Sequence, residues 1–279
     1  MRGRCGAAAK PRMLPNVQER QMKRKFAGVG GAILASAVLA GCGGGGGGSS
    51  STSGVTTSSV AAQGVYQGTT STGQAFELLV LDDGTYYDLN GTNSGNQFMV
   101  TDLIQGTSSI NGTSFSSSDM RDFLFNGQTV NGSVSATIVA ASSVNGTVTE
   151  GTNNVTFSGA PPATTTYNYN TAADINTITG SWSLTTLQGA SSSLAINANG
   201  TFSGSSNGCT YTGMVTPRSS GKNVFNVSVQ FGPSPCVLAN GSATGIALSY
   251  PISGTSLTQL LVAAVDPTRT YGTVLFGQR

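Results

Sequence analysis

The most regular stretch of the sequence is Phe225-Asn226-Val227-Ser228-Val229-Gln230-Phe231, in which apolar and polar side chains alternate at every position. A period of two places the apolar side chains on one face of an extended strand and the polar ones on the other. The same alternation recurs in Ile246, Leu248 and Tyr250, and in Phe76, Leu78 and Val80. These patterns predict strands with one buried and one solvated face, which are typical of antiparallel sheets.

Turn signals separate the apolar stretches. The dipeptide Asn-Gly favours the positive φ angles of tight hairpin turns, and it begins at Asn90, Asn111, Asn126, Asn131, Asn145, Asn199, Asn207 and Asn240. Asp82-Asp83-Gly84 predicts a further hairpin turn between two strands. One segment differs: Ser117–Phe123 begins with serines followed by an early aspartate, which predicts a single short helix.

The chain also contains an internal repeat. A shift of 116 residues aligns positions 64–86 with the later part of the chain, with seven identities and three similar pairs and without a gap. The pairs include Gly64 with Gly180, Tyr66 with Trp182, Gly73 with Gly189, and Gly84 with Gly200. We therefore expect an all-β fold of two tandem antiparallel units, at residues 63–170 and 178–279. Each is predicted to be a small barrel or sandwich of about eight strands.

The first forty-one residues differ in composition from the rest. Eight of the thirteen Lys and Arg residues lie before residue 26, and a small, apolar, uncharged stretch follows from Phe26 to Ala40. A basic start, a short apolar run and a small-residue exit are typical of an export signal. We expect residues 1–41 to be a signal peptide. Met22 is an alternative start, because Lys23-Arg24-Lys25 follows it directly.

The residues Leu39-Ala40-Gly41-Cys42 resemble the lipobox of bacterial lipoproteins at every position. In that family the cysteine thiol takes a diacylglycerol, cleavage occurs before the cysteine, and the new amino group is acylated. The resemblance implies that Cys42 carries the lipid, and several acyl chains give a lasting membrane anchor. The residue after the lipidated cysteine is Gly43 and not Asp. By the same resemblance, this implies that the protein is anchored in the outer membrane, either on its periplasmic face or at the cell surface.

The segment from 42 to 62 joins this anchor to the first predicted strand. It consists of a glycine run, Gly43 to Gly48, followed by a stretch rich in Ser, Thr and Gly. Such a composition buries little apolar surface, so we expect a flexible, disordered tether between the lipid and the β units.

The charge of the mature chain argues against nucleic acid as a partner. From Cys42 onward the sequence has five basic and ten acidic residues, a net charge of −5, because the leader carries most of the basic ones. Binding to nucleic acid requires a concentrated basic surface that displaces counterions. The expected partners are the membrane, through the lipid, and a small ligand or an envelope or host protein.

The cysteines predict one disulfide bond. Cys5 belongs to the leader and Cys42 is the lipidated residue, which leaves Cys209 and Cys236. Export delivers these two to an oxidising compartment, so we expect them to pair. Closing this loop stabilises the folded chain by about 3–4 kcal/mol in the chain-entropy account.

The chemistry needed for common catalytic and metal sites is missing. The sequence contains no histidine, which removes Ser-His-Asp and Cys-His catalysis and imidazole zinc sites. We therefore predict a protein that is not an enzyme, with no catalytic, cofactor-binding or metal-binding residues. The tightest acidic cluster, Asp82, Asp83 and Asp88, is interpreted as part of a hairpin turn, with a weak calcium site as the alternative.

Gly180-Ser181-Trp182 resembles the Gly-x-Trp opening of lipocalin- and avidin-like barrels, and Gly64-Val65-Tyr66 is a variant of it. In those barrels the aromatic residue plugs one end, and a basic residue near the last strand packs across it. The resemblance implies that role for Arg269. It is equally compatible with the small barrels of surface-binding lipoproteins.

These observations favour an outer-membrane lipoprotein that serves as a binding or interaction module. The alternative is a structural envelope or surface protein with solid β cores. The aromatic residues either line a pocket or pack the cores: Tyr66, Tyr86, Tyr87, Phe98, Trp182, Phe202, Tyr211, Tyr250 and Tyr271. An open cavity of more than a few hundred cubic ångströms favours the first hypothesis, and filled barrels favour the second.

Overall fold

The computed structural model describes residues 62–94 and 97–279. Within this part every regular element is a β-strand except one short 3-10 helix, η2 (Ile175–Thr177). No helix in the described ranges is long and apolar enough to cross a membrane. The predicted signal peptide, Cys42 and the tether up to residue 61 lie outside the described residues.

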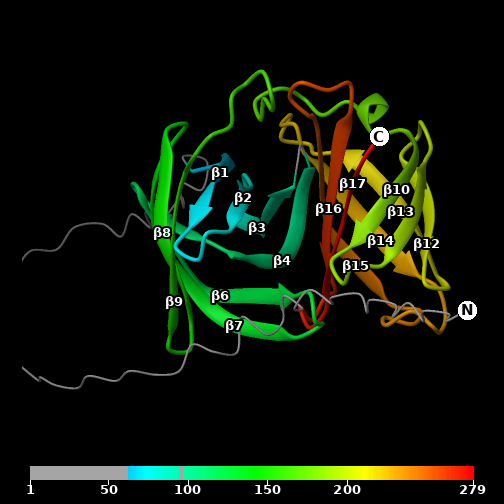
Figure 1. Cartoon of the computed structure of the whole chain (residues 1–279), viewed down its shortest axis with the longest axis horizontal. Helices are drawn as coiled ribbons and strands as arrows, with labels where there is room; N and C mark the ends of the chain where they lie inside the picture. Colours follow the sequence, from blue (N-terminus) through cyan, green and yellow to red (C-terminus); the bar gives the residue numbers. More distant parts are fainter. Residues whose placement is uncertain (1–61, 95–96) are drawn as a thin grey trace, which may run out of the picture. The chain divides into compact units, whose positions relative to one another are not determined.

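The first nine strands form the first barrel (Figure 1). They are β1 (Gly64–Thr70), β2 (Ala75–Val80), β3 (Thr85–Ser94), β4 (Gln97–Thr107), β5 (Ser109–Asn111), β6 (Ser114–Leu124), β7 (Thr129–Val139), β8 (Ser143–Glu150) and β9 (Asn153–Ala160). The strand order is β4-β3-β2-β1-β9-β8-β7-β6, and pairing of β4 with β6 closes the ring. The short β5 pairs with β6 alone.

The last eight strands form the second barrel. They are β10 (Gly180–Thr186), β11 (Ser191–Ile196), β12 (Thr201–Ser206), β13 (Cys209–Pro217), β14 (Phe225–Phe231), β15 (Ser242–Pro251), β16 (Thr258–Val265) and β17 (Gly272–Gln278). Each strand pairs antiparallel with its neighbour in the sequence, and β17 returns to β10. The predicted fold class, two tandem antiparallel barrels of about eight strands, is confirmed.

The repeat holds in three dimensions. Gly64 pairs with Val80 in the first barrel, and Gly180 pairs with Ile196 in the second. The aromatic residues that follow make equivalent contacts four residues back: the Tyr66 hydroxyl donates to the Ala62 carbonyl at 3.2 Å, and Trp182 Nε1 donates to the Ile178 carbonyl at 2.8 Å. The shift of 116 residues therefore aligns equivalent positions of two barrels.

The helix predicted at Ser117–Phe123 is wrong, because this segment lies in strand β6. The pairing with β7 shifts between Ser117 and Met120, which marks a β-bulge. The carboxylate of Asp119, at the bulge, accepts a hydrogen bond from the Thr107 backbone N–H at 2.9 Å and pairs with Arg269 at 2.8 Å. The Ser and Asp residues that suggested a helix cap serve this irregular strand instead.

The turn prediction for Asn-Gly is right for five of the eight dipeptides, including Asn199-Gly200, and the Asp82-Asp83-Gly84 turn is confirmed. The dipeptides at Asn90, Asn131 and Asn145 lie inside strands. Inside these strands glycine, which has no side chain, leaves room for atoms of a neighbouring strand. A Cβ atom on Gly146, for example, would lie 2.6 Å from the ring of Phe157.

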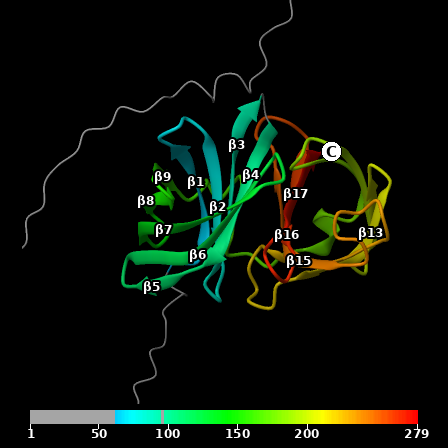
Figure 2. The same ribbon diagram turned by 90° about the horizontal axis from the view of Figure 1, so that it is seen from below.

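Each barrel has an apolar core of its own, and a separate apolar cluster joins the barrels through strand faces that point away from both barrel interiors. It includes Leu79, Tyr87 and Leu103 of the first barrel and Leu261 and Phe276 of the second. Figure 2 shows the strands concerned, with β3 and β4 beside β16 and β17.

Polar contacts border this cluster. Arg218 pairs with Asp82 at 2.5 Å and with Asp83 at 2.8 Å, and the Tyr250 hydroxyl donates to Glu77 at 2.8 Å. Burial raises the pKa of Glu77 to about 7, against the opposing effect of this hydrogen bond. The two barrels thus share an apolar contact with polar edges.

Candidate ligand-binding cavity

A cavity of about 410 Å³ occupies the interior of the second barrel. Alternate side chains of its strands point inward, as the period of two predicted, and the walls are apolar. Representative lining residues are Leu194, Phe202, Val227, Ala264 and Leu275. The cavity extends from the loops at one end of the barrel down to Ile178 near the other.

Trp182 and Arg279 close one end of the barrel. The guanidinium carbon of Arg279 lies 4.0 Å from the centre of the Trp182 ring, and the Trp182 side chain is buried. This is the plug that the Gly-x-Trp resemblance implied, but the basic residue is Arg279. The role implied for Arg269 is wrong, because its guanidinium pairs with Asp119 of β6 and donates to the backbone carbonyl oxygens of Gln105 and Asp119.

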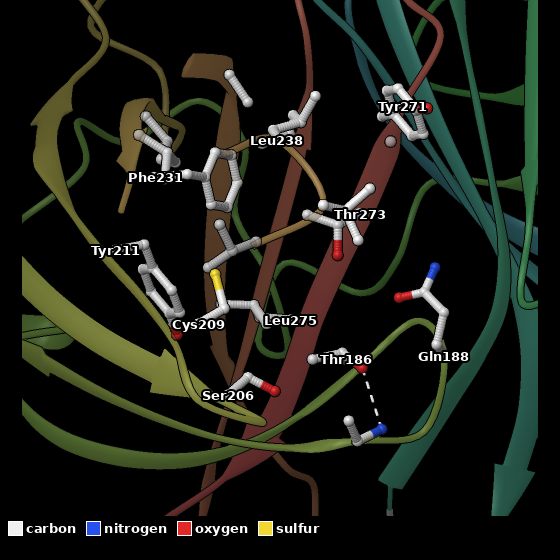
Figure 3. Close-up of a pocket in the computed structure, with 18 of the residues that line it drawn as sticks. Thr186, Gln188, Ser206, Cys209, Tyr211, Phe231, Leu238, Tyr271, Thr273 and Leu275 are labelled. Carbon is white, nitrogen blue, oxygen red and sulfur yellow. Dashed lines mark hydrogen bonds between the residues drawn. The ribbon is translucent and has the colours of Figure 1, made fainter. Parts of the chain in front are cut away.

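The other end of the barrel is open and is formed by four loops. These are residues 187–190, 207–208, 232–241 and 266–271, and each contributes side chains or backbone to the cavity wall. In Figure 3, Tyr211 and Phe231 lie on one side of the cavity and Gln188 and Thr273 on the other.

The predicted disulfide bond between Cys209 and Cys236 is confirmed, and it lies at this open end. Cys209 begins β13, and Cys236 belongs to the loop of residues 232–241. The bond therefore ties the longest of the four loops to the barrel wall. Figure 3 shows the Cys209 sulfur beside the cavity.

The open end offers little charge to a ligand. Asp266 and Arg269 are the charged residues of the four loops. Asp266 accepts backbone N–H groups of Thr270 at 2.7 Å and Tyr271 at 2.6 Å within its own loop. Burial acts to raise its pKa, but the hydrogen bonds from Thr268, Thr270 and Tyr271 hold the pKa below its usual value. Both charges are therefore used within the protein, and neutral side chains surround the opening.

The first barrel is filled where the second is hollow. Its interior contains an empty space of only about 10 Å³, because large aromatic side chains pack there. Tyr86, for example, packs against Phe115 with ring centres 5.4 Å apart. The repeat locates one decisive difference. Phe76, whose ring packs edge-on against Phe157 at 5.5 Å, aligns with Ser192 in the second barrel. The Ser192 hydroxyl hydrogen-bonds the Tyr211 hydroxyl at 2.6 Å.

Three aspartates lie in or close to the first barrel's core. Asp88, Asp102 and Asp122 each have one buried carboxyl oxygen without a hydrogen-bond partner. Burial, and then the neighbouring charges of Asp102 and Glu77, raise the pKa of Asp88 to about 8. Burial, and then the neighbouring carboxyls of Asp102, Glu150 and Asp88, raise the pKa of Asp122. The space beside Asp88 inside this barrel, about 10 Å³, is too small for a ligand.

The calcium alternative finds no support in the geometry. Asp82 and Asp83 pair with Arg218, whereas Asp88 lines the small space inside the barrel. Across residues 62–94 and 97–279, no group of three or more Cys, Asp or Glu side chains is placed to hold a metal ion.

Both hypotheses about the aromatic residues hold, each for a different subset. Phe202, Tyr211 and Tyr271 line the cavity. The other six pack in the barrel interiors or between the barrels: Tyr66, Tyr86, Tyr87, Phe98, Trp182 and Tyr250. Sequence reasoning missed the aliphatic lining. The signal was present in the small residues at inward positions, such as Ala243, Ala247 and Ala264.

No protein-family model matches this sequence, and no curated protein sequence matches it. Among solved structures, the chain is similar to isotype 1 transferrin binding protein B from serogroup B Neisseria meningitidis, at 10% sequence identity and a TM-score of 0.25. The match covers 74% of this chain and 66% of that chain. These comparisons assign the protein to no family.

Proposed function

We propose that this protein is a lipid-anchored binding protein of the bacterial outer membrane, and that its second barrel takes a small apolar molecule. The observation that carries this proposal is the open, apolar cavity of about 410 Å³. Small-molecule sites are concave and mostly apolar, with volumes of roughly 300–1,000 Å³. A few hydroxyl and amide groups at the opening, such as Gln188 and Thr273, supply hydrogen bonds to a polar end of the ligand.

The contrast between the barrels supports this proposal over a purely structural role. A filled barrel gains dispersion contacts that a hollow one forgoes, and the first barrel shows that this architecture can be filled. The small residues inside the second barrel leave space empty, so this barrel lacks the stabilisation that such contacts give. The first barrel, solid and joined to the second by an apolar cluster, fits the role of a support.

Filling the cavity is expected to abolish ligand binding. Ala264 is buried and points into the cavity from β16, so Ala264→Phe places an aromatic ring in the space. Because the ring occupies existing volume, the melting temperature should stay within about 4 °C of the unaltered protein. Binding of the apolar fluorophore N-phenylnaphthylamine, measured by its fluorescence rise, should weaken at least about tenfold, since the ring removes the apolar surface that the fluorophore would bury.

The matched control is Ala195→Phe, which adds the same ring to the exposed outer face of β11. It should leave fluorophore binding unchanged. Equal binding by the Ala264→Phe and unaltered proteins would contradict the proposed use of the cavity.

Lipid attachment at Cys42 is tested separately. The Cys42→Ser chain has no thiol to take the diacylglycerol, so it should lose incorporation of radioactive palmitate and shift from the membrane fraction to the soluble fraction of cells. Fluorophore binding by this variant should match the lipidated protein, because the cavity lies in residues far along the chain. If the protein with Cys42 intact takes up no palmitate and is found in the soluble fraction, the proposed lipid anchor is contradicted.

A further inference from the structure

Exposed apolar side chains surround the open end of the cavity. Val237, in the loop of residues 232–241, is 80% exposed, and Tyr271, in the loop of residues 266–271, is 46% exposed. Phe125, in the turn between β6 and β7, is 51% exposed, and the neighbouring residues Leu124 and Gly127 border the cavity. We call Phe125, Val237 and Tyr271 the apolar rim.

The apolar rim is exposed, and the loops around it present no free charge. The charged groups of the four loops, Asp266 and Arg269, are held in contacts within the protein. Gln188, Ser206 and Asn207 present neutral hydrogen-bonding groups beside the opening. An apolar, uncharged surface enters the boundary between headgroups and acyl chains at little electrostatic cost, and aromatic residues such as tyrosine are favoured there.

We propose that the apolar rim docks on the phospholipid bilayer and that the cavity takes an acyl chain from a lipid of that bilayer. This inference rests on the proposed function, and it adds the source and chemical class of the ligand. The hydrocarbon chain occupies the apolar cavity, and the lipid headgroup stays at the opening beside the neutral polar groups. Docking buries the rim and opens a route from the bilayer to the cavity that avoids water.

The predicted anchor leaves enough chain for this arrangement. Gln63, at the start of the described part, contacts Tyr169 at 3.4 Å, and Tyr169 pairs through its carbonyl with Asn223, in the loop between β13 and β14. The first described residues thus lie near the closed end of the second barrel. Twenty residue steps separate Cys42 from Ala62, and a chain of that length reaches at most about 66–72 Å. This limit exceeds the length of a barrel strand of eight residues, roughly 26 Å.

The test uses the mature chain with Cys42→Ser, so that the anchor does not itself bring the protein to the vesicles. Phosphatidylcholine vesicles carry a phosphatidylcholine with a self-quenching fluorescent acyl chain, and extraction of that lipid appears as a rise in fluorescence. Binding of N-phenylnaphthylamine in solution is measured in parallel. We expect Phe125→Asp to slow extraction at least about fivefold, because it replaces an apolar rim contact with a charge, while its solution binding is unchanged.

Two controls separate the possible failures. Val139→Asp places the same charge at another exposed apolar position, on β7, and should leave both readouts unaltered. Ala264→Phe should lose both fluorophore binding in solution and lipid extraction from vesicles. If the chain binds the fluorophore but extracts no lipid, or if Phe125→Asp extracts as fast as Val139→Asp, bilayer docking is overturned and the proposed function stands. If the unaltered chain binds no fluorophore, the proposed function fails first.

Discussion

Replacement of Asp88 with asparagine is expected to stabilise the protein at pH 9 by about 3–5 kcal/mol and to remove the part of the pH dependence of its folding that Asp88 contributes. Burial and the neighbouring carboxyls of Asp102 and Glu77 raise the pKa of Asp88 from 3.8 to about 8 in the folded chain. The folded state therefore binds a proton that the unfolded state releases. This contribution to stability is present in full below about pH 4 and is lost as the pH rises to 8 and above.

Urea denaturation at pH 5 and pH 9 measures this effect. The unaltered protein should be markedly less stable at pH 9, and Asp88→Asn should reduce the difference. Asp174→Asn is the control, because Asp174 is exposed and caps the 3-10 helix. Equal stability of the unaltered protein at the two pH values would show that the Asp88 carboxyl has no such pKa.

Removal of the disulfide bond is expected to have an effect of similar size. Cys209 and Cys236 are 27 residues apart, and opening a loop of this length should lower the free energy of unfolding by about 3–4 kcal/mol. Denaturation of the Cys209→Ala, Cys236→Ala double variant measures this loss, and the reduced unaltered protein should match it. Because the bond holds the loop of residues 232–241 at the opening, fluorophore affinity should fall as well.

A double variant that loses less than about 1 kcal/mol would contradict the stabilising role. Unchanged fluorophore affinity in the same variant would show that the loop keeps its position at the opening without the bond.

The two-barrel architecture was predictable because it depends on short-range patterns. Alternation in Phe225–Phe231 identifies the inward face of a strand, and the repeat at positions 64–86 indicates that the architecture occurs twice. The errors came from residues with two uses. Ser and Asp at Ser117–Phe123 suit a helix start and also a β-bulge, and only the pairing with β7 decides between them.

The cavity was harder to predict because it depends on what is missing from the interior. Whether a barrel is hollow follows from the summed volume of side chains on all its strands, which a strand-by-strand pattern does not report. The alignment of Phe76 with Ser192 carried part of this information. The contact between the barrels was also hidden, although the nearly continuous apolar stretch Leu260–Val265 in β16 is typical of a strand buried on both faces.

The most direct test of the central claim, that the second barrel holds an apolar ligand, is photocrosslinking. A fatty acid with a diazirine in its chain is bound to the mature protein and activated, and the labelled residues are identified by mass spectrometry. The account predicts label on inward positions of the second barrel, such as Leu194, Val227 and Val262, and its loss in Ala264→Phe. Label confined to the outer faces or to the first barrel would contradict it.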